Sequence, residues 1–530
     1  MQEKRQITRA AGVMALATGL SRVAGLVRDI VTAAVFGAGY AADAFFVAFT
    51  IPNLLRRFFA EGSLTAAFVP TFAETHHRHG AAAGRELLRI CWTLLLLVMA
   101  GVTLLGILAS PWVVKLIGYG FAEVPGKLAL TDLLNRIMFP YIFCVSLLAL
   151  LAGVLNVRGH FLTPSLSPVL LNLAMIAAAL VLAPRFEQPI LALAIGVLIG
   201  GVLQLFLQLP VLYRFGYDLR PDFRFNHPAV GKIARLMIPG IFGVAIYQIN
   251  VVVTRLLASL LPEGSVSWLY YGQRLFEFPQ GIFIVSLAQA VLPSMSRQAA
   301  AADQAGFRES LRFALVLILL VTLPAAAGLA LCALPVYSLF FMGGAFTPED
   351  VLQAAAALAW YAPGLLFVGI SRVVVPTFYA MQDTRTPVLI SFWTLLVNVV
   401  CGLVLMGPLQ HVGLALALTL SSVFNALVLL WCLDRRMGGI GLAGLLRIGL
   451  RLLPGLLAMT LTAGLILGSV EWQVAGPFWV RLAVLGGAVV GGALVYALSC
   501  WLCRVGEVQQ AWEFLAVRLW RRLRGGKDAG

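Results

Sequence analysis

The sequence contains few charged residues. Asp, Glu, Lys and Arg make up only 12% of its 530 residues, about half the share in a typical soluble protein. No stretch is both polar and long enough to form a separate soluble domain, and no loop exceeds about twenty residues. None of these loops carries the paired acids that a membrane glycosyltransferase needs for a metal ion and a nucleotide sugar. These absences argue against an enzyme.

Reactive side chains are scarce as well. Seven cysteines lie in or beside apolar runs: Cys91, Cys144, Cys332, Cys401, Cys432, Cys500 and Cys503. The C-x-x-C spacing of the last two is a weak redox signal without a βαβ context, so packing as small apolar residues is favoured. The histidines of “HHRH” at 76–79 fall in a polar loop, which favours a solvated loop over a metal site. No metal or cofactor is predicted.

Long apolar runs fill most of the chain. Hydrophobic residues make up 61% of the sequence, and each run is close to the ~20 residues that a helix needs to cross a bilayer. The pattern predicts an all-α polytopic membrane protein with about fourteen transmembrane helices. Their expected ranges are 11–36, 41–73, 87–110, 128–157, 161–183, 190–213, 232–260, 266–295, 309–333, 351–380, 386–407, 411–433, 444–468 and 478–502.

The distribution of basic residues predicts the orientation. With a cytoplasmic N-terminus, 26 of the 38 Lys and Arg residues lie on the cytoplasmic side, and four lie opposite: Lys115, Lys127, Arg185 and Arg481. We therefore expect both termini in the cytoplasm. The N-terminus weakly resembles a signal peptide, but its apolar run resumes after Arg22, which favours an uncleaved helix. The net charge of +15 then reflects topology and contact with anionic membrane lipids, and no nucleic acid is needed to explain it.

Arginines also occur at membrane depth. There are eight of them: Arg22, Arg28, Arg56, Arg57, Arg136, Arg255, Arg274 and Arg372. Facing lipid at the bilayer centre, each would cost about 2.5–3.5 kcal/mol, or roughly 20–28 kcal/mol together, which exceeds a typical folding stability. Arg136 and Arg255 are candidates for a place near the membrane interface. The others require a water-filled cavity or acidic partners.

The stretch “SRVAGLVRDI” at 21–30 gathers its polar residues on one side. At about 100° per residue, Ser21, Arg22, Arg28 and Asp29 fall within an arc of about 120°, and the residues on the opposite side are apolar. This pattern predicts one wall of a wet, cationic cavity.

Two other spans repeat this polar face. Arg274 and Glu277 share one side of the span 266–295, and Asp43, Arg57 and Glu61 fall within about 40° of one another in the span 41–73. Ion pairs that only pin the helices together are the alternative interpretation. However, arginines outnumber the nearby acids two to one, which favours an anionic ligand such as phosphate.

A weak internal repeat suggests two lobes. The dipeptide “TP” recurs at 163 and 386, and Asn172 is followed by Asn398 at a similar spacing. A unit of about 220 residues holds six helices, so two copies share one orientation, as in transporters that bind substrate between lobes. We therefore predict two pseudo-symmetric six-helix lobes, 1–220 and 221–437, followed by two further helices and a basic tail in 438–530.

Four runs resemble a known family: “SRVAGLVRD”, “FGAGYAADAFFVAFTIPNLLRRFFAEGSLTAAFVPTF”, “SVSWLYYGQRLFEFPQG” and “MQDTRTPV”. From about residue 8 to 505 the chain resembles the MurJ (MviN) family of bacterial lipid II flippases, part of the multidrug/oligosaccharidyl-lipid/polysaccharide exporter superfamily. The resemblance implies alternating access that carries lipid II, an undecaprenyl-pyrophosphate disaccharide-pentapeptide, from the inner to the outer leaflet of the cytoplasmic membrane. It also implies a lipid-tail groove at the last two helices and suggests peptidoglycan-synthesis proteins as partners.

The resemblance further implies the site residues. The substrate-binding residues that match are Arg22, Arg28, Asp29, Arg56 and Arg274. The predicted supporting cavity or gate residues are Ser21, Asp43, Asn53, Arg57, Glu61, Glu277 and Arg372. Arg255 departs from the family pattern, and its role stays open.

The energy source is predicted from charge. An empty cationic cavity is drawn toward the negative cytoplasm, so we expect the membrane potential to reset the carrier. Flipping in vesicles that is indifferent to an imposed potential of either sign would contradict this. A coupled ion stays the alternative.

Two other functions stay open. A flippase for another polyprenyl-pyrophosphate-linked glycan would bind the same pyrophosphate, and only the motif match separates it. A drug or cation antiporter of the same fold would need an excess of membrane carboxylates, whereas arginines are in excess here.

Overall fold

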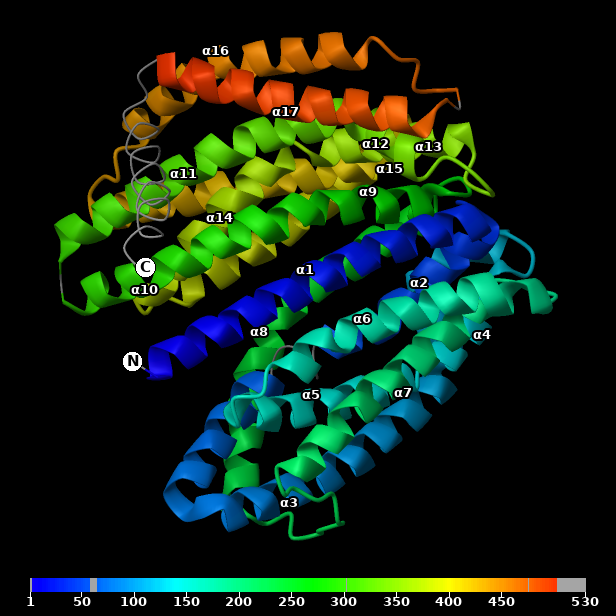
Figure 1. The fold of residues 1–530 in the computed structure, drawn as a ribbon, viewed down its shortest axis with the longest axis vertical. Helices are drawn as coiled ribbons and strands as arrows, with labels where there is room; N and C mark the ends of the chain where they lie inside the picture. The colour runs from blue at the N-terminus through cyan, green and yellow to red at the C-terminus, as the bar shows by residue number, and fades with distance from the viewer. Residues whose placement is uncertain (1, 58–63, 302, 475, 503–530) are drawn as a thin grey trace, which may run out of the picture. The chain divides into compact units, whose positions relative to one another are not determined.

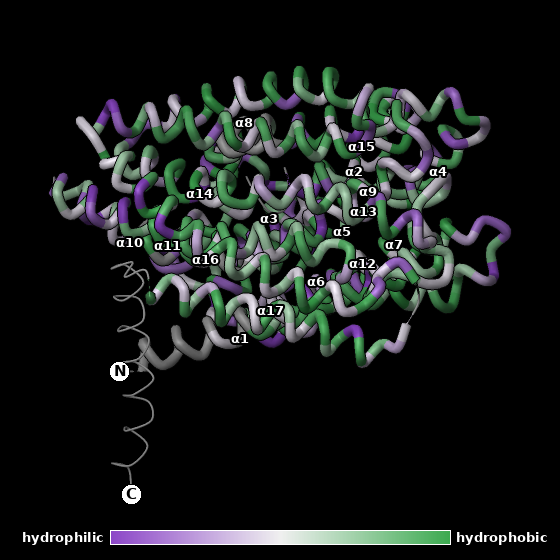
Figure 2. The backbone as a smooth tube through the Cα atoms, turned by 90° about the horizontal axis from the view of Figure 1, so that it is seen from above, coloured by the Kyte–Doolittle hydropathy of each residue, from purple (hydrophilic) through white to green (hydrophobic). Residues whose placement is uncertain are grey.

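The structure is a computed structural model that describes residues 2–57, 64–301, 303–474 and 476–502. Helices form nearly all of the regular structure in these ranges, where one isolated β-bridge, between Gly343 and Phe346, is the only β-type pairing. Figure 1 shows the helices, and Figure 2 shows hydrophobic residues along much of their length. The prediction of an all-α membrane protein is confirmed at this level.

The chain divides into two compact units. The first comprises Met1–Trp268 and Gly343–Asp350, and the second comprises Leu269–Met342 and Val351–Gly530. The first unit contains α1 (Gln2–Phe36), α2 (Tyr40–Arg56), α3 (Leu64–Ile117), η2 (Tyr119–Glu123), α4 (Lys127–Met138), α5 (Tyr141–Val157), α6 (Leu162–Ala177), η3 (Ala178–Leu182), η4 (Ala183–Arg185), α7 (Leu191–Arg214) and α8 (Pro228–Ser259).

The second unit is also helical. It contains η5 (Gln280–Ile284), α10 (Val285–Ala300), α11 (Gln304–Leu331), α12 (Ala333–Phe340), α14 (Gly364–Ala380), α15 (Arg385–Met437), α16 (Leu442–Leu467) and α17 (Phe478–Leu502). Helices α9 (Ser265–Pro279) and α13 (Pro348–Tyr361) begin in the first unit and end in the second. The three-part division at residues 220 and 437 stays a prediction.

Two helices are too long for a single membrane crossing. Helices α3 and α15 run for 54 and 53 residues, but each contains a residue with non-helical torsion angles, Gly80 (φ 83°) and Gln410 (φ 49°). Glycine adopts positive φ freely because it has no Cβ, whereas glutamine does so at a steric cost. Both breaks fall between predicted spans, 41–73 and 87–110 in one case and 386–407 and 411–433 in the other.

Several helices are able to cross a membrane. Among the described residues, eight are long and apolar enough, or nine if α13 and α14, which are bent by 43°, form one span. A multi-pass membrane protein is therefore confirmed, and the number fourteen stays a prediction.

Small residues let helices of the first unit approach closely. Helix α7 packs against α5 and α6, and α6 packs against α1. A Cβ at Gly201 would lie 2.7 Å from the Tyr141 ring, and one at Gly200 would lie 2.7 Å from Leu171. Because lipid tails are as apolar as these side chains, such close packing is a main source of helix association in a membrane. It holds α7 against α5 and α6.

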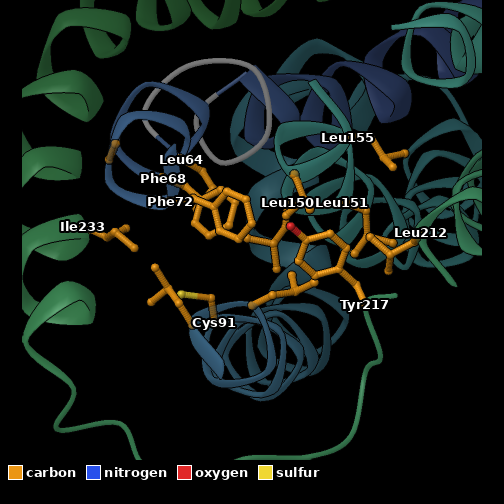
Figure 3. Close-up of a cluster of buried hydrophobic side chains, with 14 residues drawn as sticks. Leu64, Phe68, Phe72, Cys91, Leu150, Leu151, Leu155, Leu212, Tyr217 and Ile233 are labelled. Atoms are coloured by element: carbon orange, nitrogen blue, oxygen red, sulfur yellow. The ribbon is translucent and has the colours of Figure 1, made fainter. Parts of the chain in front are cut away.

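A cluster of buried apolar side chains joins α3, α5, α7 and α8 (Figure 3). The rings of Phe68 and Phe72 stack with centroids 5.4 Å apart, and the Tyr217 ring lies 6.1 Å from that of Phe72. Tyr217 follows α7, so this cluster holds the start of the α7–α8 connection against α3.

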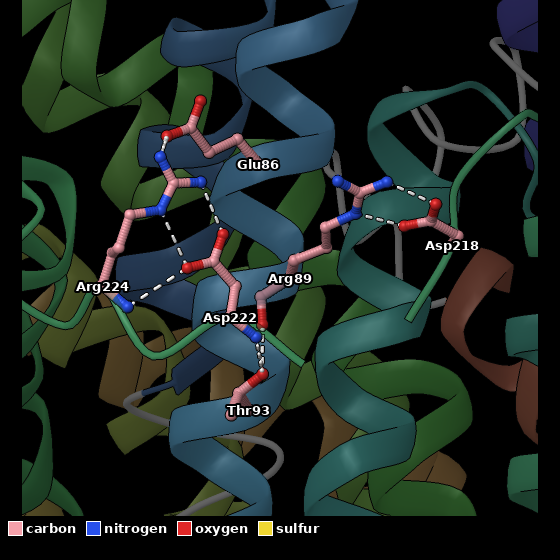
Figure 4. A network of polar contacts seen from close by, with 6 residues as sticks. All are labelled: Glu86, Arg89, Thr93, Asp218, Asp222 and Arg224. Atoms are coloured by element: carbon pink, nitrogen blue, oxygen red, sulfur yellow. Dashed lines mark hydrogen bonds and ion pairs between the residues drawn. The ribbon is translucent and has the colours of Figure 1, made fainter. Parts of the chain in front are cut away.

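Polar contacts pin the same connection to α3 (Figure 4). The Nη1 atom of Arg224 lies 2.8 Å from Glu86, and its Nη2 atom donates to Asp222 at 2.6 Å. Arg89 of α3 pairs with Asp218 through two hydrogen bonds. The connection is thus fixed by both apolar and ionic contacts.

A single buried arginine anchors the last two helices, which pack side by side (Figure 1). Arg481 of α17 donates from Nη1 to Ser338 Oγ on α12 at 3.0 Å and from Nη2 to the Glu471 carbonyl at 2.7 Å. It is only 4% exposed. The sequence placed Arg481 among the charges of an outer loop, but the structure uses it inside the protein.

We expect the contacts of Figure 4 to weaken at acid pH. Hydrogen bonds from Arg89 and Arg224 lower the pKa of Asp218 and Asp222, respectively, below the ordinary value of 3.8. Because these pKa values are lowered in the folded state, their contribution to stability is present above the ordinary pKa and is lost as pH falls through the lowered ones. The melting temperature of the detergent-purified protein should therefore drop below about pH 4. The drop should be smaller in Asp218→Asn/Asp222→Asn, and an equal drop in both proteins would contradict the interpretation.

Candidate functional site

Arg28 lies buried where α1 packs against α6. Its Nε and Nη2 atoms donate to Asp29 Oδ1 at 3.0 and 2.6 Å, and its Nη1 atom donates to Asn172 Oδ1 at 3.1 Å. The side chains of the ion pair are 7% and 2% exposed. A guanidinium removed from water needs its hydrogen bonds met, and Asp29 and Asn172 accept three of them.

Asn172 of α6 contacts α1 at two levels. Its Oδ1 atom accepts from Arg28, and its Nδ2 atom donates to the Ser21 carbonyl at 3.3 Å. Ser21 and Arg28 are two helical turns apart, so one amide fixes both the helix and the arginine side chain. In the sequence, Asn172 stands out only through the repeat, where Asn398 follows it at a similar spacing. Asn172 is a single amide inside an apolar span, and a polar side chain at such a position usually has a polar partner on another helix.

The polar arc predicted for residues 21–30 faces the protein. Arg28 and Asp29 are buried and Arg22 is half-buried, whereas Leu20 and Val23, on the opposite side of α1, are 52% and 56% exposed. The predicted two-sided helix is therefore present. At Arg28, however, the arc is a packed surface rather than a wet wall, because α6 lies directly against it.

The end of α2 carries a second amide-held arginine. Arg56 donates from Nε and Nη2 to Asn53 Oδ1 at 3.1 and 2.9 Å. Arg57 follows directly and is half-buried. Glu61, the acid predicted beside them, lies outside the described residues. Asn53 thus orients Arg56 in the way that Asn172 orients Arg28.

Asp43 has other partners than those expected. Its carboxylate lies 3.0 Å from Lys127 Nζ, with both side chains 2% exposed. It also accepts hydrogen bonds from the backbone N–H groups of Gly264 and Ser267, both at 2.9 Å, and from the Ser267 hydroxyl at 2.7 Å. It therefore satisfies free N–H groups at the start of α9. Periodicity within one helix placed Asp43 beside Arg57 and could not show a lysine 84 residues away.

Two further arginines have separate environments. Arg136 is 44% exposed and pairs with Asp132 at 2.8 Å, which fits a place near the membrane interface. Arg255 is only 8% exposed and donates to the Val266 carbonyl at 3.2 Å. A carbonyl inside the protein thus accepts from the Arg255 guanidinium, and the place of Arg255 near the membrane interface stays a prediction.

The second unit carries the remaining predicted charges. Arg274 Nη1 lies 3.5 Å from Glu277 Oε2 one turn along α9, with side chains 41% and 34% exposed. Arg372 is exposed on α14. Because a lipid-facing charge is costly at membrane depth, the surface of this unit that carries these residues requires water or a polar ligand.

The few cysteines and histidines lie apart from the arginines described above. Four of the six described cysteines are buried, Cys91, Cys144, Cys332 and Cys500, and Cys503 lies outside the described ranges. The loop predicted at 76–79 is instead part of helix α3, just before its break at Gly80. His77 and His79 are exposed on this helix, whereas His76 is half-buried and lies 2.8 Å from Arg158. Burial and the neighbouring Arg158 lower the His76 pKa. Within 2–57, 64–301, 303–474 and 476–502, no group of three or more His, Cys, Asp and Glu side chains suits a metal ion.

Comparison with known proteins decides the family. The family model described as “Lipid II flippase MurJ” matches residues 32–483. The chain belongs to the lipid II flippase MurJ family. A Burkholderia cenocepacia relative, “Lipid II flippase MurJ”, is 35% identical over 92% of this chain and 95% of its own length. A Haemophilus influenzae relative, “Probable lipid II flippase MurJ”, is 41% identical over 78% of this chain and 83% of its own length.

Solved structures share the fold of this MurJ family member. The lipid II flippase MurJ in an inward closed conformation matches with a TM-score of 0.75 and 26% identity, covering 92% of this chain and 97% of that one. An inward-facing multidrug resistance MATE family transporter of the MOP superfamily matches with a TM-score of 0.66 and 14% identity, covering 81% and 98%. At 14% identity the MATE transporter shows the fold alone.

We expect Lys127→Met to destabilise the protein by about 3–5 kcal/mol, because it leaves the Asp43 carboxylate charged and buried. Thermal unfolding of the detergent-purified protein measures this. Adding Asp43→Asn should recover much of the loss, since an uncharged amide still accepts from the start of α9. Lys115→Met, at an exposed lysine, is the matched control. Equal melting temperatures for the two methionine variants would show that the ion pair adds nothing.

Proposed function

We propose that the chain is a lipid II flippase, a transporter that carries the undecaprenyl-pyrophosphate disaccharide-pentapeptide from the inner to the outer leaflet of the bacterial cytoplasmic membrane by alternating access. Membership of the MurJ family supports this proposal. The observation that carries it is the Arg28 guanidinium, buried in an apolar helix bundle and oriented by Asp29 and Asn172.

The substrate chemistry fits such arginines. A pyrophosphate presents several charged oxygens, and a guanidinium binds two oxygens at once through its fork of N–H donors. Asp29 neutralises Arg28 when no anion is bound, and Asn172 and Asn53 hold the Arg28 and Arg56 side chains without adding negative charge. We propose that Arg28 and Arg56 bind the pyrophosphate, with Arg22 beside them, in a state of the transport cycle in which α6 moves away from α1 and uncovers Arg28. Arg274 stays a predicted ligand from the sequence.

The acids of the first unit argue against a cation antiporter. Such a transporter needs carboxylates that are able to exchange a proton or a cation. Asp29 is paired with Arg28 and Asp43 with Lys127, so both of these buried acids already have a cationic partner. A flippase for another polyprenyl-pyrophosphate glycan stays the alternative, and binding of the two lipids by the purified protein separates them.

The proposal includes an orientation. We propose that both termini lie in the cytoplasm, and the excess of basic residues in the predicted cytoplasmic loops supports this. The peptidoglycan-synthesis machinery, which consumes lipid II on the outer side, is the partner that this function suggests.

We expect Arg28→Ala and Arg274→Ala each to slow lipid II flipping in reconstituted vesicles by roughly ten- to a hundredfold, the loss of a hydrogen-bonded charged contact. Arg28→Lys should also be impaired, because lysine keeps the charge but loses the fork. Arg220→Lys, at an arginine that is 83% exposed, is the control. Normal flipping by both alanine variants would overturn the site.

We expect Asn172→Ala to slow flipping about tenfold while the protein still folds, because Arg28 loses the acceptor that orients it. Asn172→Asp keeps an acceptor but adds a negative charge that competes with the pyrophosphate, so it should weaken lipid II binding. Asn425→Ala is a matched control. Within the described residues, the hydrogen bond of the Asn425 side chain is a long one of 3.4 Å to the Ser371 hydroxyl. Asn172→Asp binding as tightly as the unmodified chain would show that the amide acts only in packing.

A further inference from the structure

An arginine cluster lies where α11 and α16 pack together in the second unit (Figure 1). Arg312 of α11 lies against the first turn of α16, because a Cβ built on Gly444 would be 3.6 Å from its Nη2 atom. Arg447 and Arg451 follow on α16, and all three arginines are exposed. Measured from Gly444 at about 100° per residue, Arg447 and Arg451 lie at about −60° and −20°. They therefore share the side of α16 that Arg312 contacts.

Nearby acids leave this cluster positively charged. Across 303–474 and 476–502, none of the three arginines forms an ion pair with a described carboxylate. Glu309, one turn before Arg312, is exposed. Neighbouring arginines have partners of their own: Arg308 donates to the Met437 carbonyl, and Arg436 pairs with Asp383. The cluster thus has three guanidinium groups available to an anion.

The depth of these residues points to the membrane interface. Helix α16 begins at Leu442 and is apolar enough to span a membrane. Its 26 residues make it about 39 Å long, roughly 9 Å longer than the hydrocarbon core of a bilayer. With this excess at the start of the helix, Arg447 and Arg451 lie within about 5 Å of the hydrocarbon boundary, a distance over which long arginine side chains reach the lipid headgroups. In the orientation inferred from the basic residues, this is the cytoplasmic end of α16.

A stripe of leucines runs beside the arginines. Leu446, Leu450 and Leu457 are 67%, 56% and 67% exposed. On the same helical wheel they fall at about −160°, −120° and −140°, next to the arginines and opposite the buried side of α16. Hydrocarbon chains are able to lie along this stripe while a headgroup contacts the guanidinium groups.

We propose that Arg312, Arg447 and Arg451 bind the phosphate of an anionic phospholipid in the inner leaflet, with an acyl chain along the leucines. Forked donors fit the two free oxygens of a phosphodiester, and the lipid supplies the counter-charge that arginines at this depth require. The leucine stripe favours a lipid over free phosphate. The proposal does not depend on which substrate the transporter carries.

Native mass spectrometry of the full chain tests this with phosphatidylglycerol as the probe, compared with phosphatidylcholine and inorganic phosphate. Arg447→Gln/Arg451→Gln should weaken the tightest phosphatidylglycerol binding by roughly tenfold, because each charge near an anionic headgroup contributes about a fewfold. Arg447→Lys/Arg451→Lys should keep part of it. Arg312→Gln, on the neighbouring helix, should weaken the same binding and gives a second test that leaves α16 unchanged.

The control removes the same charge elsewhere. Arg214 and Arg297 are exposed arginines at the predicted cytoplasmic ends of α7 and α10, and Arg214→Gln/Arg297→Gln should leave the tightest binding unchanged. Equal weakening in the two double glutamine variants would overturn the site, since only general charge would matter. It would also be overturned if phosphatidylcholine bound as tightly as phosphatidylglycerol, or if equimolar inorganic phosphate displaced the lipid.

Discussion

A guanidinium that leaves water keeps its charge, so the helices around Arg28 have to supply the hydrogen bonds that water would have supplied. Asp29 supplies the opposite charge. Asn172 supplies an acceptor for Arg28 and also donates to the Ser21 carbonyl of α1. The close approach of α6 to α1 and α7 makes this possible, because an amide reaches a guanidinium only across a short gap. The glycines of α7 therefore matter to a side chain that they do not touch.

The same rule applies to the other buried charges. Lys127 and Asp43 neutralise each other, and Asp43 also satisfies the start of α9. Arg481 donates to a backbone carbonyl and to a hydroxyl. These acceptors satisfy hydrogen bonds without cancelling the charge, so Arg481 raises the positive potential of the interior around it. Such a potential suits a protein that handles an anionic lipid.

Local sequence patterns predicted the helices and the two faces of α1, but they could not predict contacts between residues that lie far apart in the sequence. Apolar runs gave the helices, and the angular spacing of Arg28, Asp29 and Val23 gave the two faces of α1. Asn172 lies 144 residues from Arg28, and Lys127 lies in a segment that read as a loop, so helical periodicity could not pair them with their partners. A buried lysine and an exposed one look alike in the sequence, because only the fold decides which one leaves water.

The Arg28–Asp29 pair lies on a single helix, which bears on how the protein is made. Both residues enter the bilayer with α1, long before the ribosome has produced α6 and its Asn172. An arginine and an aspartate that already neutralise each other lower the cost of inserting this segment, which unpaired would be about 2.5–3.5 kcal/mol for each charge. Asp29 thus neutralises Arg28 first, while α1 inserts into the membrane. Once α6 has inserted, Asp29 and Asn172 together hold the Arg28 side chain.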